Sequence, residues 1–146
     1  MKLRGLLVLV LALLPLSARS DGETRLSLRA EGARNAKGKV LCLLFATQDG
    51  FPLDPKLARA SAEATIRDGV ALCEFRDIAP GRYAICGFHD ENGNEEIDLG
   101  VFGIPKEGLV ASRNAPMRFG PPKFKDAVFD YAGGVVEVRA KLRYYL

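Results

Sequence analysis

The chain has 146 residues, of which 48% are hydrophobic and 27% are charged, and its formal net charge is +3. A chain of this length suits one ordinary domain that buries its own core. The positive excess comes from Lys2, Arg4 and Arg19, and the remaining residues carry 18 basic and 18 acidic side chains. A nucleic-acid-binding domain needs a basic patch or stripe, so we expect no nucleic-acid partner.

The first 20 residues have the layout of a secretory signal peptide. Lys2 and Arg4 form a short positive region, residues 6–14 are an unbroken apolar run, and residues 15–20 supply a proline and small residues. Cleavage after Ala18 or after Ser20 would leave a small residue at the cut. The apolar run is shorter than the roughly 20 residues of a membrane-spanning helix. We therefore predict a signal peptide over 1–20, one domain over 21–146, an exported protein that is periplasmic or secreted, and no membrane span after cleavage.

Several short segments of the remaining chain have the patterns of β-strands. Residues 24–31 and 135–145 alternate between polar and apolar side chains, as half-buried strands do. Residues 39–46 and 82–89 are apolar on both faces, and residues 65–75 predict a hairpin with a tight turn at Asp68-Gly69. The Ala-rich segment 56–64 could hold one or two helical turns.

The spacing of these segments predicts an all-β fold, an antiparallel β-sandwich of about seven strands. Residues 99–125 form a long stretch rich in glycine and proline, and such connections are usually functional or mobile. Cys42, Cys73 and Cys86 all lie in apolar strand segments. Export would permit one disulfide, but the sequence leaves the pairing open.

An acidic loop over residues 89–98 carries oxygen-bearing side chains at every second position. Short loops of this kind wrap oxygen ligands around a hard cation such as Ca²⁺. The predicted metal ligands are Asp90, Asn92, Asn94, Glu96 and Asp98. The alternative interpretation is a solvated polar turn, because Asn92-Gly93 is also a strong hairpin-turn pair.

The fit of this loop to an EF-hand calcium loop is incomplete. Glu95 stands at the sixth position, where glycine usually permits a sharp turn. Val101 stands at the twelfth position, where a bidentate glutamate usually closes the shell. A carboxylate from elsewhere in the chain, such as Glu107 or Asp54, would have to complete a calcium site.

The order and spacing of several motifs extend over essentially the whole chain after the signal peptide. They are Pro80-Gly81-Arg82-Tyr83-Ala84, His89-Asp90-Glu91-Asn92-Gly93-Asn94 with Asp98, Gly103-Ile104-Pro105-Lys106-Glu107-Gly108, Ser112-Arg113-Asn114, and Gly120-Pro121-Pro122-Lys123-Phe124-Lys125-Asp126-Ala127. In these motifs the chain resembles the secreted bacterial family catalogued as domain of unknown function 2141. The resemblance implies an immunoglobulin-like or transthyretin-like β-sandwich and no established function. Glu95 departs from the family pattern, which usually has glycine there, and so does the segment 109–111, which is typically more aromatic.

Other candidate residues lie beside the loop and in the long connection. His89 is the only histidine, and it could serve as a base or ligand, or simply pack against the sheet and bond a neighbouring loop. A hydrolase centre combining His89 with Ser112 is conceivable, although the chain has no nucleophile-elbow motif. The candidate binding residues are His89, Glu107, Ser112, Arg113 and Asn114.

These features together predict an exported, non-enzymatic β-sandwich with an acidic loop that binds Ca²⁺ and a binding or structural role in the cell envelope. Its partner would be a protein or glycan of the envelope, and no other cofactor is expected. Two alternatives remain open. One is a small-ligand or carbohydrate-binding module that uses the 99–125 loop, and the other is a hydrolase centred on His89.

Overall fold

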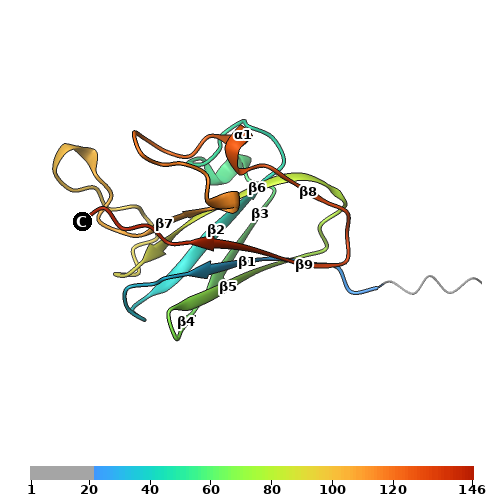
Figure 1. The fold of residues 1–146 in the computed structure, drawn as a ribbon, viewed down its shortest axis with the longest axis horizontal. Coiled ribbons are helices and arrows are strands. Elements are labelled where there is room, and N and C mark those ends of the chain that lie inside the picture. The colour runs from blue at the N-terminus through green and yellow to red at the C-terminus, as the bar shows by residue number, and fades with distance from the viewer. Residues whose placement is uncertain (1–21) are drawn as a thin grey trace, which may run out of the picture.

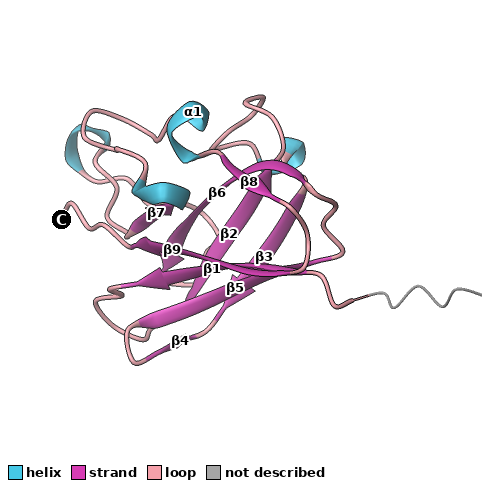
Figure 2. Cartoon of the chain, turned by 45° about the vertical axis from the view of Figure 1, so that its right-hand side comes forward, coloured by secondary structure: helices cyan, strands magenta, loops and turns pink. Residues whose placement is uncertain are grey.

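Two packed β-sheets form the protein in the computed structural model, which describes residues 22–146 (Figures 1 and 2). The predicted signal peptide and its cleavage site lie outside the described residues. The all-β sandwich predicted from the strand patterns is confirmed, with nine strands rather than about seven. Among residues 22–146, no helix has the length and apolar character needed to cross a membrane.

The nine strands divide into a four-stranded and a five-stranded sheet. The four-stranded sheet has the order β4 (Ile66–Arg67), β5 (Val70–Arg76), β1 (Arg25–Glu31) and β9 (Val135–Lys141). The five-stranded sheet has the order β3 (Ala60–Ala64), β2 (Lys39–Phe45), β6 (Gly81–Asp90) and β7 (Leu109–Ala111), with β8 (Phe129–Tyr131) paired to the start of β6.

One strand pair departs from the predicted antiparallel arrangement. All other neighbours are antiparallel, but β1 and β9 run in parallel, with Arg25 opposite Val135 and Glu31 opposite Lys141. The reason is that β8 belongs to the opposite sheet. The chain therefore crosses to the four-stranded sheet after β8 and enters β9 at the end where β1 also begins, with the Arg25 N–H donating to the Gly134 carbonyl at 3.0 Å.

In the described residues 22–146, helical structure is confined to single turns. They are the 3-10 turns η1 (Pro55–Leu57), η2 (Val101–Gly103) and η3 (Ser112–Asn114) and the short helix α1 (Phe124–Ala127). The helical turns expected over 56–64 are wrong for residues 60–64, which form β3. The segment is a strand because its burial alternates. Its alanines pack against the core at every second position, while Ser61 and Glu63 face outward.

The main core lies between the two sheets, where the alternating apolar residues of each strand meet. Leu26, Leu28 and Ala30 of β1 are fully buried, as their spacing predicts. On β6, Tyr83 and Ile85 point into the same core. Strand alternation therefore sends Ala84, Cys86 and the other residues of the second set to the outer face of the five-stranded sheet.

A second, smaller core covers part of that outer face. It consists of Ala84, Ala111, Ala115, Met117 and Ala127, with Phe51, Leu109 and Phe124 packed against it. The stretch 99–125 is therefore not one irregular connection, because it contains η2, β7, η3 and the start of α1. Ala111 and Ala115 are small, so the middle of this stretch packs closely on the sheet.

Candidate functional site

The acidic loop begins where β6 ends, and the buried Asp90 organises it. Only 1% of Asp90 is exposed. Its Oδ1 accepts hydrogen bonds from the backbone N–H groups of Gly93 at 2.9 Å and Asn94 at 3.2 Å, and its Oδ2 accepts one from Glu95 at 2.9 Å. One carboxylate thus folds the next five residues around itself.

The alternating oxygen-bearing residues face one another across this loop. The Asn92 side-chain oxygen accepts from the Asn94 backbone N–H at 3.2 Å, and that of Asn94 accepts from the Glu96 N–H at 3.0 Å. Both amides also donate to Asp98, from Asn92 Nδ2 to Oδ2 at 2.6 Å and from Asn94 Nδ2 to Oδ1 at 3.1 Å. Four of the five predicted ligands are therefore brought together, whereas the exposed Glu96 contributes its backbone N–H.

Glu95 adopts the turn conformation in which calcium loops usually have glycine. Its φ is +62°, in the left-handed region. An L-residue in that region costs roughly 1–2 kcal/mol relative to the right-handed conformation. The sharp turn expected at the sixth position therefore forms despite the glutamate, and the loop carries its strain.

Glu107 closes the loop from outside, as one of the two distant carboxylates considered from the sequence. It is 3% exposed, and its Oε1 and Oε2 accept from the N–H groups of Glu91 and Asp98, both at 3.3 Å. Glu107 therefore joins the first and last parts of the loop. Asp54 instead caps η1, where it accepts from the Lys56 N–H at 3.0 Å.

The carboxylates of the site differ in how their charge is balanced. Glu91 accepts from Arg34 Nε at 2.8 Å and Asn35 Nδ2 at 2.9 Å. Burial alone would raise the pKa of Glu91, but these two side chains together hold it below its ordinary value. Glu107 shows the opposite shift. Burial first, and then the neighbouring charges of Asp98 and Asp90, raise the pKa of Glu107 despite the two backbone N–H donors.

Positive charge does not reach the inner carboxylates directly. Among residues 22–146, no Lys or Arg forms an ion pair with Asp90, Asp98 or Glu107. Within the same part of the chain, no three His, Cys, Asp or Glu side chains are grouped closely enough to hold a metal ion. Any cation site here would therefore need the amide and backbone oxygens of the loop as well.

The turn before β2 supports the loop, which the sequence patterns did not reveal. Gly38 has φ +61°, and a Cβ at this position would lie 1.8 Å from the Asp90 backbone oxygen, so glycine is required. Arg34 ties the loop to the C-terminal segment by donating to the carbonyl oxygens of Lys106 at 3.0 Å and Leu146 at 2.7 Å. The sequence predicted strands at 39–46 and 82–89 but not that they pair, and it is this pairing that sets the turn beside Asp90.

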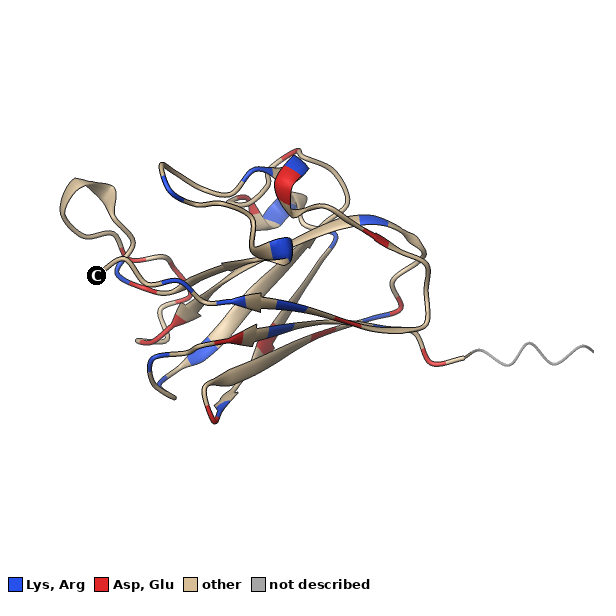
Figure 3. Cartoon of the chain, viewed as in Figure 1, with Lys and Arg blue, Asp and Glu red and all other residues tan. Residues whose placement is uncertain are grey.

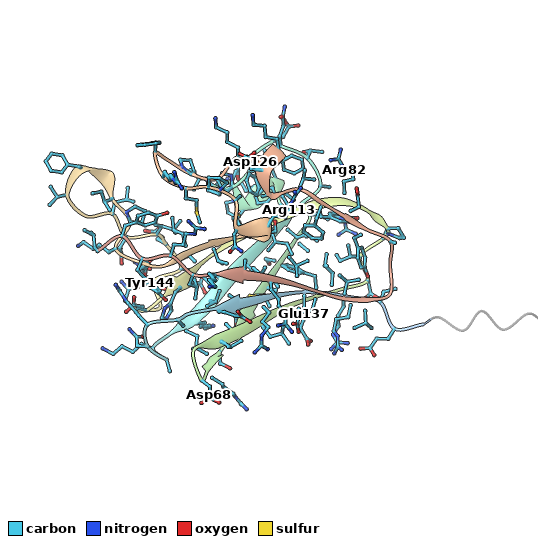
Figure 4. The ribbon with its side chains drawn as sticks, viewed as in Figure 1. Asp68, Arg82, Arg113, Asp126, Glu137 and Tyr144 are labelled. Carbon is cyan, nitrogen blue, oxygen red and sulfur yellow. The ribbon has the colours of Figure 1, made fainter. Side chains whose placement is uncertain are left out.

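His89 is buried and takes the structural role that was one of its two interpretations. Its exposure is 0%, its Nδ1 lies 2.8 Å from the Tyr144 hydroxyl, and its Nε2 lies 2.7 Å from the Lys37 carbonyl. A carbonyl only accepts, so Nε2 carries the proton and Nδ1 accepts from Tyr144. Tyr144, labelled in Figure 4, lies near the C-terminus and carries the Arg34 guanidinium 4.6 Å above its ring.

The other predicted binding residues lie away from the loop, in η3. Ser112 is fully buried, donates to the Ala127 carbonyl at 2.6 Å and accepts from the Ile85 N–H at 3.0 Å. Arg113 donates to the Val128 carbonyl at 3.0 Å, and Asn114 accepts from the Lys141 N–H at 2.9 Å. These contacts fasten η3 to its neighbours. Ser112 and His89 share no hydrogen bond, so the hydrolase alternative gains no support.

A cavity of about 830 Å³ lies on the outer face of the five-stranded sheet, beside the acidic loop. Its floor includes Leu41, Leu43 and Phe88, and its walls include Met117 and residues 121–122. Glu95, Glu96 and Ile97 of the acidic loop form one side of the cavity, and Glu63 also lines it. Blue and red segments are interspersed over both sheets (Figure 3), and the cavity combines an apolar floor with the acidic side chains of Glu63, Glu95 and Glu96.

Comparison with known families identifies the chain. The model of a family described as an uncharacterized protein conserved in bacteria (DUF2141) matches residues 28–139, and the chain belongs to this family. The resemblance noted in the sequence motifs is thereby confirmed. Neither the curated proteins nor the solved structures contain a match to the chain.

Proposed function

We propose that this member of the DUF2141 family is an exported, non-enzymatic β-sandwich whose acidic loop binds Ca²⁺, and that it acts as a binding or structural module of the cell envelope. The layout of the first 20 residues supports export. The observation that carries the calcium proposal is Glu107. This buried carboxylate lies outside the loop in sequence and accepts hydrogen bonds from the first and last parts of the loop, which supports it as the acid that would close a calcium site.

Charge balance gives the physical reason for a cation. Asp90, Asp98 and Glu107 are held close to the same loop, and like charges a few ångströms apart repel by roughly 1 kcal/mol per pair in water and by more when partly buried. Glu91, in the same loop, already has Arg34 as its partner. A cation bound at Asp98, with amide and backbone oxygens of the loop completing its ligand shell, would reduce this repulsion and fill the role that Arg34 has for Glu91.

The donor chemistry favours Ca²⁺. Every candidate ligand atom is an oxygen, from carboxylates, side-chain amides or the backbone, and hard cations prefer such ligands over nitrogen or sulfur. The amide nitrogens of Asn92 and Asn94 now donate to Asp98. An ion in front of Asp98 would take the place of those two N–H groups, and the amide oxygens would turn toward it.

Calcium titration with thermal unfolding tests this proposal. Saturation at about 100 times the Kd stabilises a protein by about 2.7 kcal/mol, which corresponds to an increase in Tm of about 10 °C for a domain of this size. Asp98→Asn should abolish the increase. The matched control is Asp130→Asn, since Asp130 is 87% exposed and lies on β8, opposite Arg82 near the start of β6. That position is about 25 Å along the strand from the loop.

The outcomes separate the proposal from nonspecific ion effects. Ca²⁺ should raise the Tm of the wild type and of Asp130→Asn equally, and Mg²⁺ at the same concentration should have a smaller effect because it demands stricter geometry. A wild type whose Tm does not respond to Ca²⁺, or an Asp98→Asn variant that responds fully, would refute calcium binding at this loop.

A second candidate function is small-ligand binding, and the 830 Å³ cavity favours it. The volume lies within the range of small-molecule sites, which are mostly apolar with a few polar groups. Residues of the predicted 99–125 stretch, among them Leu109 and Met117, line it. A thermal-shift screen of apolar and carbohydrate ligands tests this function. A true ligand should lose its effect in Leu43→Arg, which places a charged side chain on the cavity floor, whereas a ligand that stabilises this variant equally binds elsewhere.

A further inference from the structure

Two of the three cysteines point into the core between the sheets, and the third points to the outer face of the five-stranded sheet. Cys42 of β2 and Cys73 of β5 are both buried in the main core, with exposures of 1% and 0%. Cys86 of β6 points the other way, toward the outer face, and its thiol lies 3.3 Å from the Pro52 carbonyl. All three thiols are free in this structure. Only Cys42 and Cys73 therefore share a side of the sheet.

Contacts across the core bring these two thiols together. The Cys73 Sγ donates to the Val40 carbonyl at 3.7 Å, and Val40 lies two residues before Cys42, with its side chain on the same face of β2. Burial first, and then the neighbouring Cys73 thiol, raise the pKa of the Cys42 thiol. Gly87 is the residue opposite Cys42 on β6, and a Cβ there would lie 2.9 Å from the Cys42 Sγ. The glycine thus leaves the space that the Cys42 sulfur occupies.

We propose that Cys42 and Cys73 form a disulfide between the two sheets in the exported protein, and that Cys86 remains a free thiol. Two S–H bonds break and one S–S bond forms. The two electrons and two protons pass to a disulfide-bearing oxidant by thiol–disulfide exchange, which reduces its own disulfide to two thiols. This inference goes beyond the proposed function, because it involves neither the acidic loop nor calcium.

Burial determines when the bond forms and what it does. Thiols with 0–1% exposure are out of reach of an oxidant once the sandwich has closed, so exchange takes place while the chain folds. The bond would link β2 to β5 and close a loop of roughly 30 residues. In the chain-entropy model, a disulfide that closes a loop of this length raises Tm by on the order of 10 °C for a domain of this size, because it restricts the unfolded chain.

Thiol counting by mass spectrometry tests the pairing. The protein without its first 20 residues is refolded in a buffer of oxidised and reduced glutathione, unfolded in guanidinium without reductant, and treated with iodoacetamide. We expect one alkyl group, on Cys86, and a digest in which the peptides containing Cys42 and Cys73 are joined. Reduction before alkylation should give three alkyl groups.

Variants and stability provide the control. Cys86→Ser should keep the cross-linked peptide and lose the single alkyl group, and reduction should lower its Tm by about as much as that of the wild type. Three alkyl groups on the unreduced wild type would overturn the proposal, and so would a cross-link that contains Cys86. Both outcomes are read from the wild type, so they stand even if a variant does not fold.

Discussion

Replacing Glu95 by glycine should stabilise the protein, because Glu95 has a left-handed backbone conformation at φ +62°. Glycine adopts this conformation without the cost that an L-residue has, which contributes roughly 1–2 kcal/mol to the free energy of unfolding. The greater flexibility of glycine in the unfolded chain offsets roughly 0.5–1 kcal/mol of this gain. The expected net increase in the free energy of unfolding is about 1 kcal/mol, or about 3–4 °C in Tm.

Glu96→Gly is the matched control for this prediction. It also removes one glutamate from the same exposed loop and introduces the same residue, but Glu96 is not among the residues with positive φ. It should therefore destabilise the protein by roughly 0.5–1 kcal/mol, the ordinary cost of glycine. The two variants share the change in charge, so their difference isolates the backbone conformation.

Urea unfolding in EDTA measures both variants without a contribution from bound cations. The reasoning predicts midpoint shifts of opposite sign, with a difference of roughly 1.5–2 kcal/mol between the two free energies of unfolding. Equal shifts would mean that the lost charge, and not the turn, controls the loop. A Glu95→Gly variant less stable than the wild type would show that the left-handed turn is not the conformation of the loop in solution.

Three further predictions concern buried groups. Tyr144→Phe removes the hydroxyl that bonds His89 Nδ1, and leaving that buried nitrogen unpaired should cost roughly 1–3 kcal/mol in urea unfolding. Burial raises the pKa of Cys86 to about 12, so in the folded protein iodoacetamide at about pH 8 should leave it unmodified until denaturant is added. The raised pKa of Glu107 means that the folded protein keeps this proton while the unfolded chain releases it. Without Ca²⁺, stability relative to Glu107→Gln should therefore be highest below about pH 4, near the pKa of a glutamate in the unfolded chain, and fall as pH rises above it, as urea unfolding across pH would show.

The alternation of apolar residues was sufficient to predict most of the sandwich, because period-two burial is a local property of each strand. It located β1, β2, β5, β6 and β9 within a few residues of their bounds. It did not locate β3, where alanines look equally suited to a helix, and only the main core on one side of Ala60, Ala62 and Ala64 selects the strand. The parallel pairing of β1 with β9 depends on which sheet receives β8, and no local pattern carries that information.

The juxtaposition of the oxygen-bearing residues in the acidic loop was predictable from the sequence, but the contacts that support the loop were not. The spacing of Asp90, Asn92, Asn94 and Asp98 is visible in the sequence and is the spacing that the structure brings together. Arg34 is invisible to the same reasoning, because its role depends on contacts with residues 57, 72 and 112 positions away. Long-range partners of this kind follow from the topology and not from periodicity.

The distance of Glu107 from the loop in sequence has a geometric explanation. The chain leaves at Asp98, turns at η2 and returns, with the Lys106 N–H donating to the Asp98 carbonyl at 2.9 Å and Gly100 to Ile104 at 2.7 Å. The tip is 72–95% exposed at Val101 and Phe102, so core packing does not set the length of this excursion. Only its base is fixed, and the base carries Glu107 back beside Asp98. Glu107 therefore lies beside Asp98 although it comes nine residues later in the sequence, because the residues between them form a hairpin whose two ends are hydrogen-bonded to each other.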